Sequence, residues 1–225
     1  MTIQHHPSDE SLARHAAGIL PAGPNLVVAV HIAGCPDCLT GTAVFEEVGG
    51  ALLEALAPSP LAPDALDRAF AGLDEHVRPP APGRPAFAAR RRGKEPPPLP
   101  EGMVLPEPLR GCEIGPWRRL GPSVRWSRIV LPRDPDATVV LVGIGANRRL
   151  PAHGHTGTEF NQVLYGSFSD QRGCYAPGDL MEADSEVEHR PVVGPNGECI
   201  CLAAVEGSLK FHGWLGQLLR PFVGA

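Results

Sequence analysis

The stretch His153-Gly154-His155-Thr156-Gly157-Thr158-Glu159 places two histidines at alternate positions and a glutamate four residues after the second. Alternate side chains of a β-strand point to the same face, and Glu159, an even number of positions further on, can face the same interior. The turn Tyr175-Ala176-Pro177-Gly178-Asp179 follows, and His189 comes ten residues after it on another expected strand. Three imidazoles and one carboxylate that meet inside a β-barrel form a divalent metal site.

The segments around this motif are short and rich in β-forming residues from about Cys112 onward. Gly, Pro or Asn-Gly breaks separate them, as in Gly194-Pro195-Asn196-Gly197. Many short strands with almost no helix predict a barrel or a sandwich, and a surface cluster of unrelated His and Glu residues is the alternative to a metal site. The expected strands are 124–131, 137–144, 162–168, 180–183 and 199–205.

A proline-rich segment precedes this half of the chain. Residues 79–108 contain ten prolines in thirty positions, a basic run of Arg90, Arg91, Arg92 and Lys94, and almost no apolar periodicity. Such a composition is typical of an extended linker. We therefore expect two domains, at residues 1–78 and 109–225, joined by a linker over 79–108.

The pattern upstream of the linker is helical. Ser8, followed by Asp9 and Glu10, has the features of an N-cap with acidic residues in the first turn, and Asn25 is a candidate cap for the next helix. Residues 26–32 are apolar enough for a strand, yet their Ala-rich flanks favour a short buried helix. The first expected helix begins at Ser8 and ends near Pro21. The other three cover 26–32, 36–56 and 63–76.

A second group of metal-binding residue types lies within these helices. His31, Cys35 and Cys38 fall on one side of a helix that ends near Gly34 and restarts at Pro36. Zinc favours four tetrahedral sulfur and nitrogen ligands, and His5 or His6 in the N-terminal segment can supply the fourth. The alternatives are a redox-active Cys-x-x-Cys pair, or two buried cysteines beside an unrelated histidine. A structural ion would contribute much of the folding free energy of so small a helical module.

Charge and composition restrict the compartment and the partner. The net charge of the chain is −5, but residues 1–76 hold ten acidic side chains against Arg14 and Arg68. Such a module is repelled by nucleic acid and attracted to basic proteins. No apolar run is long enough for a membrane span, the first twenty residues do not resemble a signal peptide, and the six cysteines are unevenly spaced. We expect a cytoplasmic protein that binds neither membranes nor nucleic acid, and whose cysteines serve metal or redox chemistry.

The N-terminal motif resembles that of zinc-binding anti-sigma factors. His31-x3-Cys35-x2-Cys38 with an upstream histidine is similar to their signature, and Thr2-Ile3-Gln4-His5-His6 and Val48-Gly49-Gly50 resemble the ChrR branch. The resemblance implies that His6, His31, Cys35 and Cys38 bind zinc, with His6 in place of His5. It also implies that the helices wrap an extracytoplasmic-function sigma factor and hide the surfaces with which that factor binds RNA polymerase core.

The second motif resembles the cupin family, although the step from the Pro-Gly turn to His189 is longer than usual. The ChrR family carries a zinc-binding, cupin-like C-terminal domain of this sort. The resemblance implies an α+β multidomain protein, with a small four-helix zinc module followed by an all-β cupin, or double-stranded β-helix, barrel. His153, His155, Glu159 and His189 would bind the second divalent metal. Zinc is expected there, although three histidines and a glutamate also accommodate iron, manganese or nickel.

Two functions fit these motifs. A regulatory protein would release its sigma factor when the cupin domain senses singlet oxygen or a peroxide, as the ChrR resemblance implies. A metal-dependent cupin enzyme, a dioxygenase or a hydrolase, is the alternative. Four protein ligands would close a tetrahedral zinc site, so we predict a regulator that is not an enzyme. Candidate oxidant targets are the cupin ligands, the zinc thiolates of Cys35 and Cys38, and the cysteines Cys174, Cys199 and Cys201. The alternative for Cys199 and Cys201 is that they are inert core residues.

Overall fold

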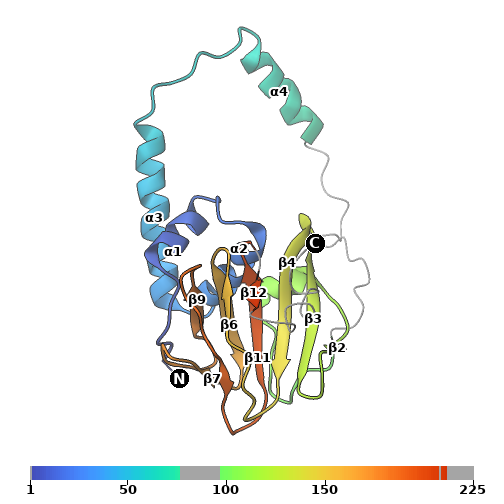
Figure 1. Cartoon of the computed structure of the whole chain (residues 1–225). Coiled ribbons are helices and arrows are strands. Elements are labelled where there is room, and N and C mark those ends of the chain that lie inside the picture. The colour runs from blue at the N-terminus through green and yellow to red at the C-terminus, as the bar shows by residue number, and fades with distance from the viewer. Residues whose placement is uncertain (1, 77–96, 208, 212–225) are drawn as a thin grey trace.

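The structure is a computed structural model that describes residues 2–76, 97–207 and 209–211 (Figure 1). In these residues four α-helices come first, followed by one 3-10 helix and then by β-strands. The predicted order of a helical module before an all-β domain is therefore confirmed. The basic run of Arg90, Arg91, Arg92 and Lys94 lies outside the described residues, as does most of the predicted linker. The helices are α1 (Asp9–Ala16), α2 (Ala22–Ile32), α3 (Pro36–Glu54), α4 (Ala65–His76) and the 3-10 helix η1 (Glu107–Gly111).

The helix boundaries follow the local capping residues, with one exception. Ser8 caps α1, because its Oγ accepts a hydrogen bond from the Ser11 amide at 3.2 Å. Residues 26–32, which are apolar enough for a strand, lie in helix α2, as their Ala-rich flanks predict. The prediction that Asn25 caps this helix is wrong, because α2 begins at Ala22, directly after Pro21. Pro24 is tolerated in the first turn, where a backbone N–H has no intrahelical partner. Asn25 lies within the helix, and its Oδ1 is 2.8 Å from Nδ1 of His15.

The strands form an antiparallel sheet in the order β1-β3-β4-β11-β6-β9, with β2 paired to β3 and two smaller sheets, β10-β7-β8 and β12-β5. The expected strand 162–168 is shifted, because β6 ends at Tyr165 and Phe168 begins another strand. Gly166 makes the turn between them with a φ of 70°. The strands are β1 (Glu113–Ile114), β2 (Arg118–Arg119), β3 (Val124–Leu131), β4 (Asp134–Ile144), β5 (His153–His155), β6 (Glu159–Tyr165), β7 (Phe168–Ser169), β8 (Cys174–Tyr175), β9 (Leu180–Ala183), β10 (Val192–Val193), β11 (Cys199–Val205) and β12 (Leu209–Phe211).

Helix α2 packs against the outer face of the large sheet. Val27 and Val28 are fully buried and share one hydrophobic core with Phe160 of β6 and Leu202 of β11. Gly23 permits this close approach, because a Cβ there would lie 3.2 Å from Cγ2 of Val139. A strand covered on both faces requires apolar side chains on both, which explains the continuous apolar run of β11. The helical part and the barrel are therefore packed together.

Polar contacts extend the same interface toward the N-terminus. Arg14 of α1 and Glu206, just after β11, form an ion pair with 2.6 Å between Nη2 and Oε1. The Glu182 carboxylate of β9 accepts hydrogen bonds from the Ser8 amide and from the hydroxyl groups of Ser8 and Ser11. These contacts fix the start of α1 on the edge strand of the sheet.

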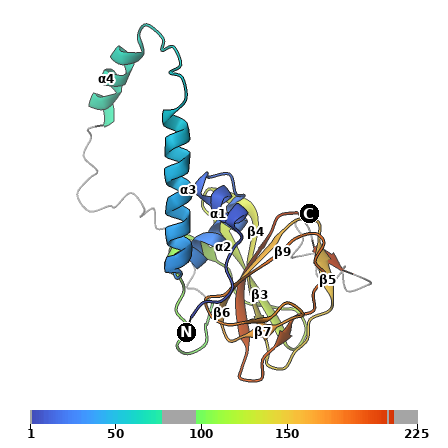
Figure 2. The ribbon, with the colours of Figure 1, turned by 90° about the vertical axis from the view of Figure 1, so that its left-hand side faces the viewer.

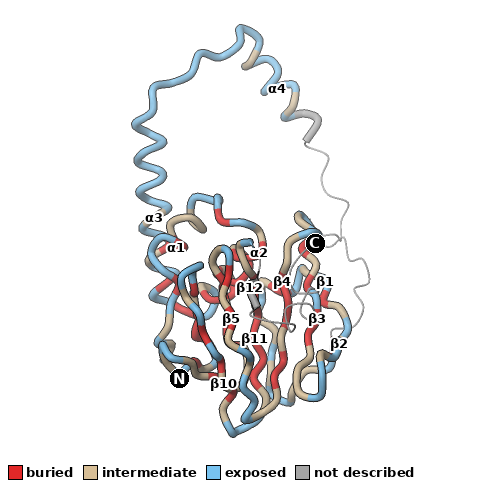
Figure 3. The backbone as a smooth tube through the Cα atoms, viewed as in Figure 1, coloured by how far each residue is buried: buried red, intermediate tan, exposed pale blue. Residues whose placement is uncertain are grey.

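Helices α3 and α4 project away from this interface, and α4 stands apart from the barrel in both views (Figures 1 and 2). In α3 the buried residues are Cys38 and Thr42, both in its first half. Most described residues of α3 and α4 are exposed to solvent (Figure 3). Among the described residues, no helix combines the length and the apolar character that crossing a membrane requires.

Candidate metal centres

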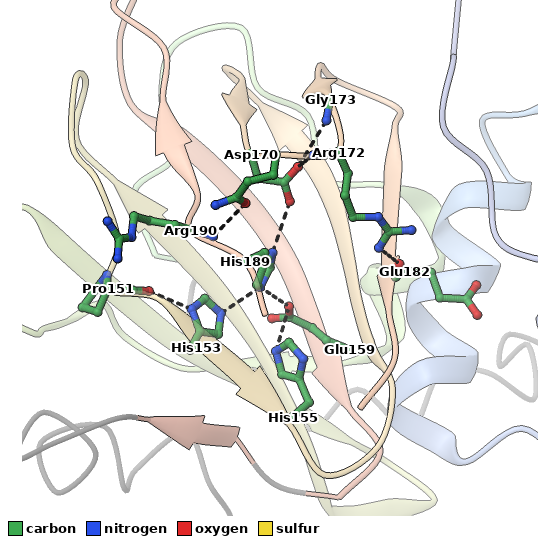
Figure 4. Close-up of polar contacts among 11 residues, drawn as sticks. Pro151, His153, His155, Glu159, Asp170, Arg172, Gly173, Glu182, His189 and Arg190 are labelled. Carbon is green, nitrogen blue, oxygen red and sulfur yellow. Dashed lines mark hydrogen bonds and ion pairs between the residues drawn. The ribbon is translucent and has the colours of Figure 1, made fainter. Parts of the chain in front are cut away.

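The four residues of the histidine-rich motif meet inside the barrel (Figure 4). His153 and His155 lie on β5, Glu159 begins β6, and His189 forms an isolated bridge with His153. Nε2 of His189 is 3.0 Å from Nε2 of His153 and 3.2 Å from Oε2 of Glu159, and Nε2 of His155 is also 3.2 Å from that oxygen. Glu159 is 6% exposed and His155 is fully buried. Three Nε2 atoms and one carboxylate oxygen thus share a single closed space.

Contacts outside this space fix the orientation of two imidazoles. Nδ1 of His153 lies 3.0 Å from the carbonyl oxygen of Pro151, and Nδ1 of His189 lies 3.3 Å from Oδ2 of Asp170. Both acceptors require the proton on Nδ1, which leaves each Nε2 lone pair directed at the centre. The Asp170 side chain is fully buried, and its other oxygen accepts from the amides of Arg172 and Gly173.

The chemistry of this donor set fits a divalent cation. Within the described part of the chain, Nδ1 of His155 lacks a hydrogen-bond partner despite complete burial, and the buried Oε2 of Glu159 has the imidazole nitrogens of His155 and His189 beside it, each at 3.2 Å. Burial alone would raise the pKa of Glu159, but the rings of His155 and His189 hold that pKa well below its usual value. Burial lowers the pKa of His153, which favours its neutral, metal-binding form. A cation would satisfy the carboxylate and the nitrogen lone pairs together.

The structure also brings together the four residues of the N-terminal motif. Nδ1 of His6 lies 3.4 Å from Sγ of Cys35 and 3.3 Å from Sγ of Cys38, and Nε2 of His31 lies 3.3 Å from Sγ of Cys38. His31 and both cysteines are buried, whereas His6 is exposed. His31 lies in the last turn of α2, Cys35 precedes α3 and Cys38 lies in its first turn. With His6 from the N-terminal segment, one ion here would tie three chain segments together.

Burial sets the protonation states of the ligands at this second centre. Burial lowers the pKa of His31, and Nδ1 of that ring is held 3.1 Å from Oε1 of Gln162 on β6. Burial and the neighbouring Cys35 raise the pKa of Cys38 to about 12. A thiol of this kind becomes a thiolate only when a cation compensates its charge, as zinc does.

The two candidate N-terminal histidines point in different directions. His6 faces the cysteines, whereas Nε2 of His5 lies 3.1 Å from the carbonyl oxygen of Cys174, and its ring packs on Tyr175. The amides of Gln4 and His5 both donate to Oδ1 of Asp179, at 2.7 and 3.0 Å. This extended segment places successive side chains on opposite sides.

Two of the three candidate sensor cysteines lie together in the barrel core, and the third is exposed. Sγ of Cys199 lies 3.6 Å from Sγ of Cys201, and both residues are buried, whereas Cys174 is exposed. The contact with Cys199, burial and the carboxylate of Glu159 hold the pKa of Cys201 well above its usual value. The expectation that Cys199 and Cys201 share one face of a strand is confirmed.

Sequence reasoning missed the residues that support the ligands. The sequence places Gln162 only in a strand and Asp179 only in a turn, and its pattern assigns no role to Asp170. A short Asx turn at Asp170-Gln171-Arg172-Gly173 is the one local signal, and it does not indicate the contact with His189.

Comparison with known proteins agrees with this architecture. Residues 111–208 match the family model described as the ChrR cupin-like domain. The anti-sigma-E factor ChrR of Cereibacter sphaeroides is 38% identical over 222 residues, which cover 99% of both chains. A chain in the crystal structure of Rhodobacter sphaeroides SigE in complex with the anti-sigma ChrR matches with a TM-score of 0.65 and 34% identity, over 91% of this chain and 100% of that one. With this identity over nearly its whole length, the chain belongs to the ChrR family of anti-sigma factors.

Proposed function

We propose that this protein is a cytoplasmic anti-sigma factor that sequesters an extracytoplasmic-function sigma factor through its N-terminal helices and releases it under oxidative stress. Its relatives are regulatory proteins, which makes the chain a regulator and not a cupin enzyme. The observation that carries the proposal is the exposed apolar surface of α3 and α4, in a family with a member crystallised together with a sigma factor.

This sigma-facing surface is defined by ten large apolar side chains on α3, α4 and the segment between them. Each of these side chains is more than half exposed. So many exposed apolar side chains on consecutive elements are typical of a site that binds another protein. Acidic residues on α3, among them Glu46, Glu47 and Glu54, suit a basic protein partner. The apolar members of the surface are Leu39, Val44, Val48, Leu52, Leu53, Leu56, Leu61, Leu66, Phe70 and Leu73.

We assign His6, His31, Cys35 and Cys38 to a zinc ion. The ion would fix the N-terminal segment and the end of α2 to the first turn of α3, and so set the direction in which α3 carries its apolar surface. We also propose the division into an anti-sigma domain at 1–78, a linker at 79–108 and a cupin-like domain at 109–225. The contact of α2 with the sheet means that the first and third parts fold against each other.

We assign His153, His155, Glu159 and His189 to a second divalent metal, for which we propose zinc. This centre would sense the oxidant, and the buried pair Cys199 and Cys201 lies in the same barrel core. When bound, the ion supplies a positive charge that neutralises Glu159 and satisfies the imidazoles. The protein itself supplies the closed space, because every one of the four side chains is buried.

The test is copurification of the full chain with each extracytoplasmic-function sigma factor of its own genome, combined with elemental analysis. We expect a stable one-to-one complex with one such factor and about two metal ions per chain. The double substitution Val48→Glu and Leu52→Glu places two charges on one face of α3 and should reduce capture at least about tenfold.

Val104→Glu is the matched control, because Val104 is at least as exposed as Val48 and Leu52 but lies outside the sigma-facing surface. It should leave capture unchanged. A wild-type chain that retains none of these sigma factors, or a double variant that binds as well as the wild type, would contradict the proposal.

A further inference from the structure

Strand β6 carries residues of both metal centres on its two faces. Glu159 points into the barrel, and Gln162, three positions later, points to the face covered by α2, where its Oε1 lies 3.1 Å from Nδ1 of His31. Three residues of strand span about 10 Å, so one rigid element connects the two sites. Gln162 is 3% exposed and His31 is 1% exposed, so this hydrogen bond is shielded from water.

The hydrogen bond defines which nitrogen of His31 is available to a metal. Oε1 of Gln162 is an acceptor, so Nδ1 of His31 carries the proton and donates it. The lone pair then lies on Nε2, the atom that faces Sγ of Cys38 at 3.3 Å. A metal-bound histidine is usually fixed in this way by a second residue. In this protein that residue comes from the barrel, 131 positions away along the chain.

His6, the other imidazole of the N-terminal centre, also depends on the barrel. Asp179 accepts hydrogen bonds from the amides of the two residues before His6, and the Leu180 amide donates to the carbonyl oxygen of His5 at 3.0 Å. Leu180 begins β9 and pairs with Gln162 in the register of the sheet. Both imidazoles are therefore positioned by neighbouring points on β6 and β9.

We propose that Gln162 is a positioning residue of the N-terminal zinc centre and that β6 couples the two metal sites, so that occupancy of the cupin site strengthens metal binding by His6, His31, Cys35 and Cys38. Without its ion, the cupin site holds the buried Glu159 carboxylate, at the start of β6, directly against the Nε2 atoms of His155 and His189 at 3.2 Å, and leaves Nδ1 of His155 with no hydrogen-bond partner among the described residues. Relaxation of this end of the strand would displace Gln162 and loosen His31. This inference rests on the proposed ligands and gives the cupin domain a physical route to the sigma-binding helices.

Cobalt provides the test, because Co2+ bound by cysteine thiolates has a charge-transfer absorption that a site of three histidines and a glutamate lacks. The full-length chain is titrated with Co2+, and then with Zn2+ in competition. Gln162→Leu should lower the affinity of the thiolate site about 10- to 100-fold, which is typical for loss of a residue that orients a metal ligand. Gln162→Glu keeps an acceptor for Nδ1 of His31 and should restore most of the affinity.

The coupling is measured in a double-mutant cycle with Glu159→Gln, and His155→Ala serves as a second way to empty the cupin site. Each should weaken Co2+ binding at the thiolate site severalfold in the wild-type background and have no such effect when Gln162 is leucine. By thermodynamic reciprocity, Cys38→Ser should weaken metal binding at the cupin site by the same factor.

Glu206→Gln is the matched control, because it removes the ion pair with Arg14 across the same interface without contact to any proposed ligand. It should leave both metal affinities unchanged. Equal thiolate-site affinity in the wild type and Gln162→Leu would overturn the coupling, and so would a Glu159→Gln effect that persists with leucine at position 162. Neither outcome would contradict sigma binding by the N-terminal helices. A wild-type chain without thiolate absorption would instead contradict the proposed ligand set.

Discussion

Oδ2 of Asp170 lies 3.3 Å from Nδ1 of His189, and this carboxylate, fully buried, orients the imidazole that comes from the most distant part of the cupin motif. The contact explains how a ligand separated from the others by a long and irregular segment is held in place. An anionic acceptor also makes the His189 ring a stronger metal ligand through its Nε2 atom.

We therefore expect Asp170→Asn to lower metal affinity at the cupin site about 10- to 100-fold, because an amide is a weaker acceptor for Nδ1 of His189 than a carboxylate. Competition with a chromophoric chelator measures the change. Asp184→Asn is the control, since Asp184 also caps a turn, through the Glu186 amide, but is exposed. Equal losses in the two variants would refute a specific role for Asp170.

Cys38→Ser should remove the N-terminal ion and with it sigma binding. The first turn of α3 would lose its connection to His6 and His31, so the apolar surface of α3 would no longer be held in one direction. Elemental analysis should show about one metal ion fewer per chain, with little sigma factor copurified. Cys112→Ser, at a half-buried residue outside both centres, should retain both properties. A Cys38→Ser chain that still captures the factor fully would count against the zinc requirement.

Gly23→Val should destabilise the interface between α2 and the sheet by about 1–3 kcal/mol, because the added side chain meets Cγ2 of Val139 and Cβ of Ala204. The midpoint of denaturant unfolding reports the loss. Gly49→Val, also within a helix but with open space around its Cα, should leave stability equal or slightly higher, since valine forms helix better than glycine. If Gly23→Val proved as stable as the wild type, the close approach of α2 to the sheet would be in question.

His153→Ala should leave the sigma factor bound but blunt its release by singlet oxygen or an organic peroxide. The substitution empties the proposed sensor but changes no ligand of the cysteine site and no residue of the apolar surface of α3. Release is followed as loss of sigma factor from the immobilised complex during oxidant exposure. Leu150→Ala, near the same strand but outside the ligand set, serves as the control. Release at the wild-type rate from His153→Ala would remove the sensor role from this site.

The helices and the metal motifs could be predicted because their signals are local. Ser8 with its following acids marks the start of α1, and Pro36 marks the first turn of α3. His153 and His155 share a strand face by alternation alone, and His31 and Cys38 come together through helical spacing. Each pattern depends on residues a few positions apart, where backbone geometry fixes the separation of side chains.

The sequence by itself determined the two classes of metal ligand, the four helices and the β-rich second half. Only the tertiary structure decided that His6 and not His5 faces the cysteines, that Asp170 supports His189 and that Gln162 reaches His31. Gln162 and His31 are 131 positions apart, and an ordinary polar residue on a strand carries no signal of its distant partner. That contact exists because α2 buries its apolar residues against β6, and hydrophobic packing of this kind is set by the shape of the whole surface and by no local pattern.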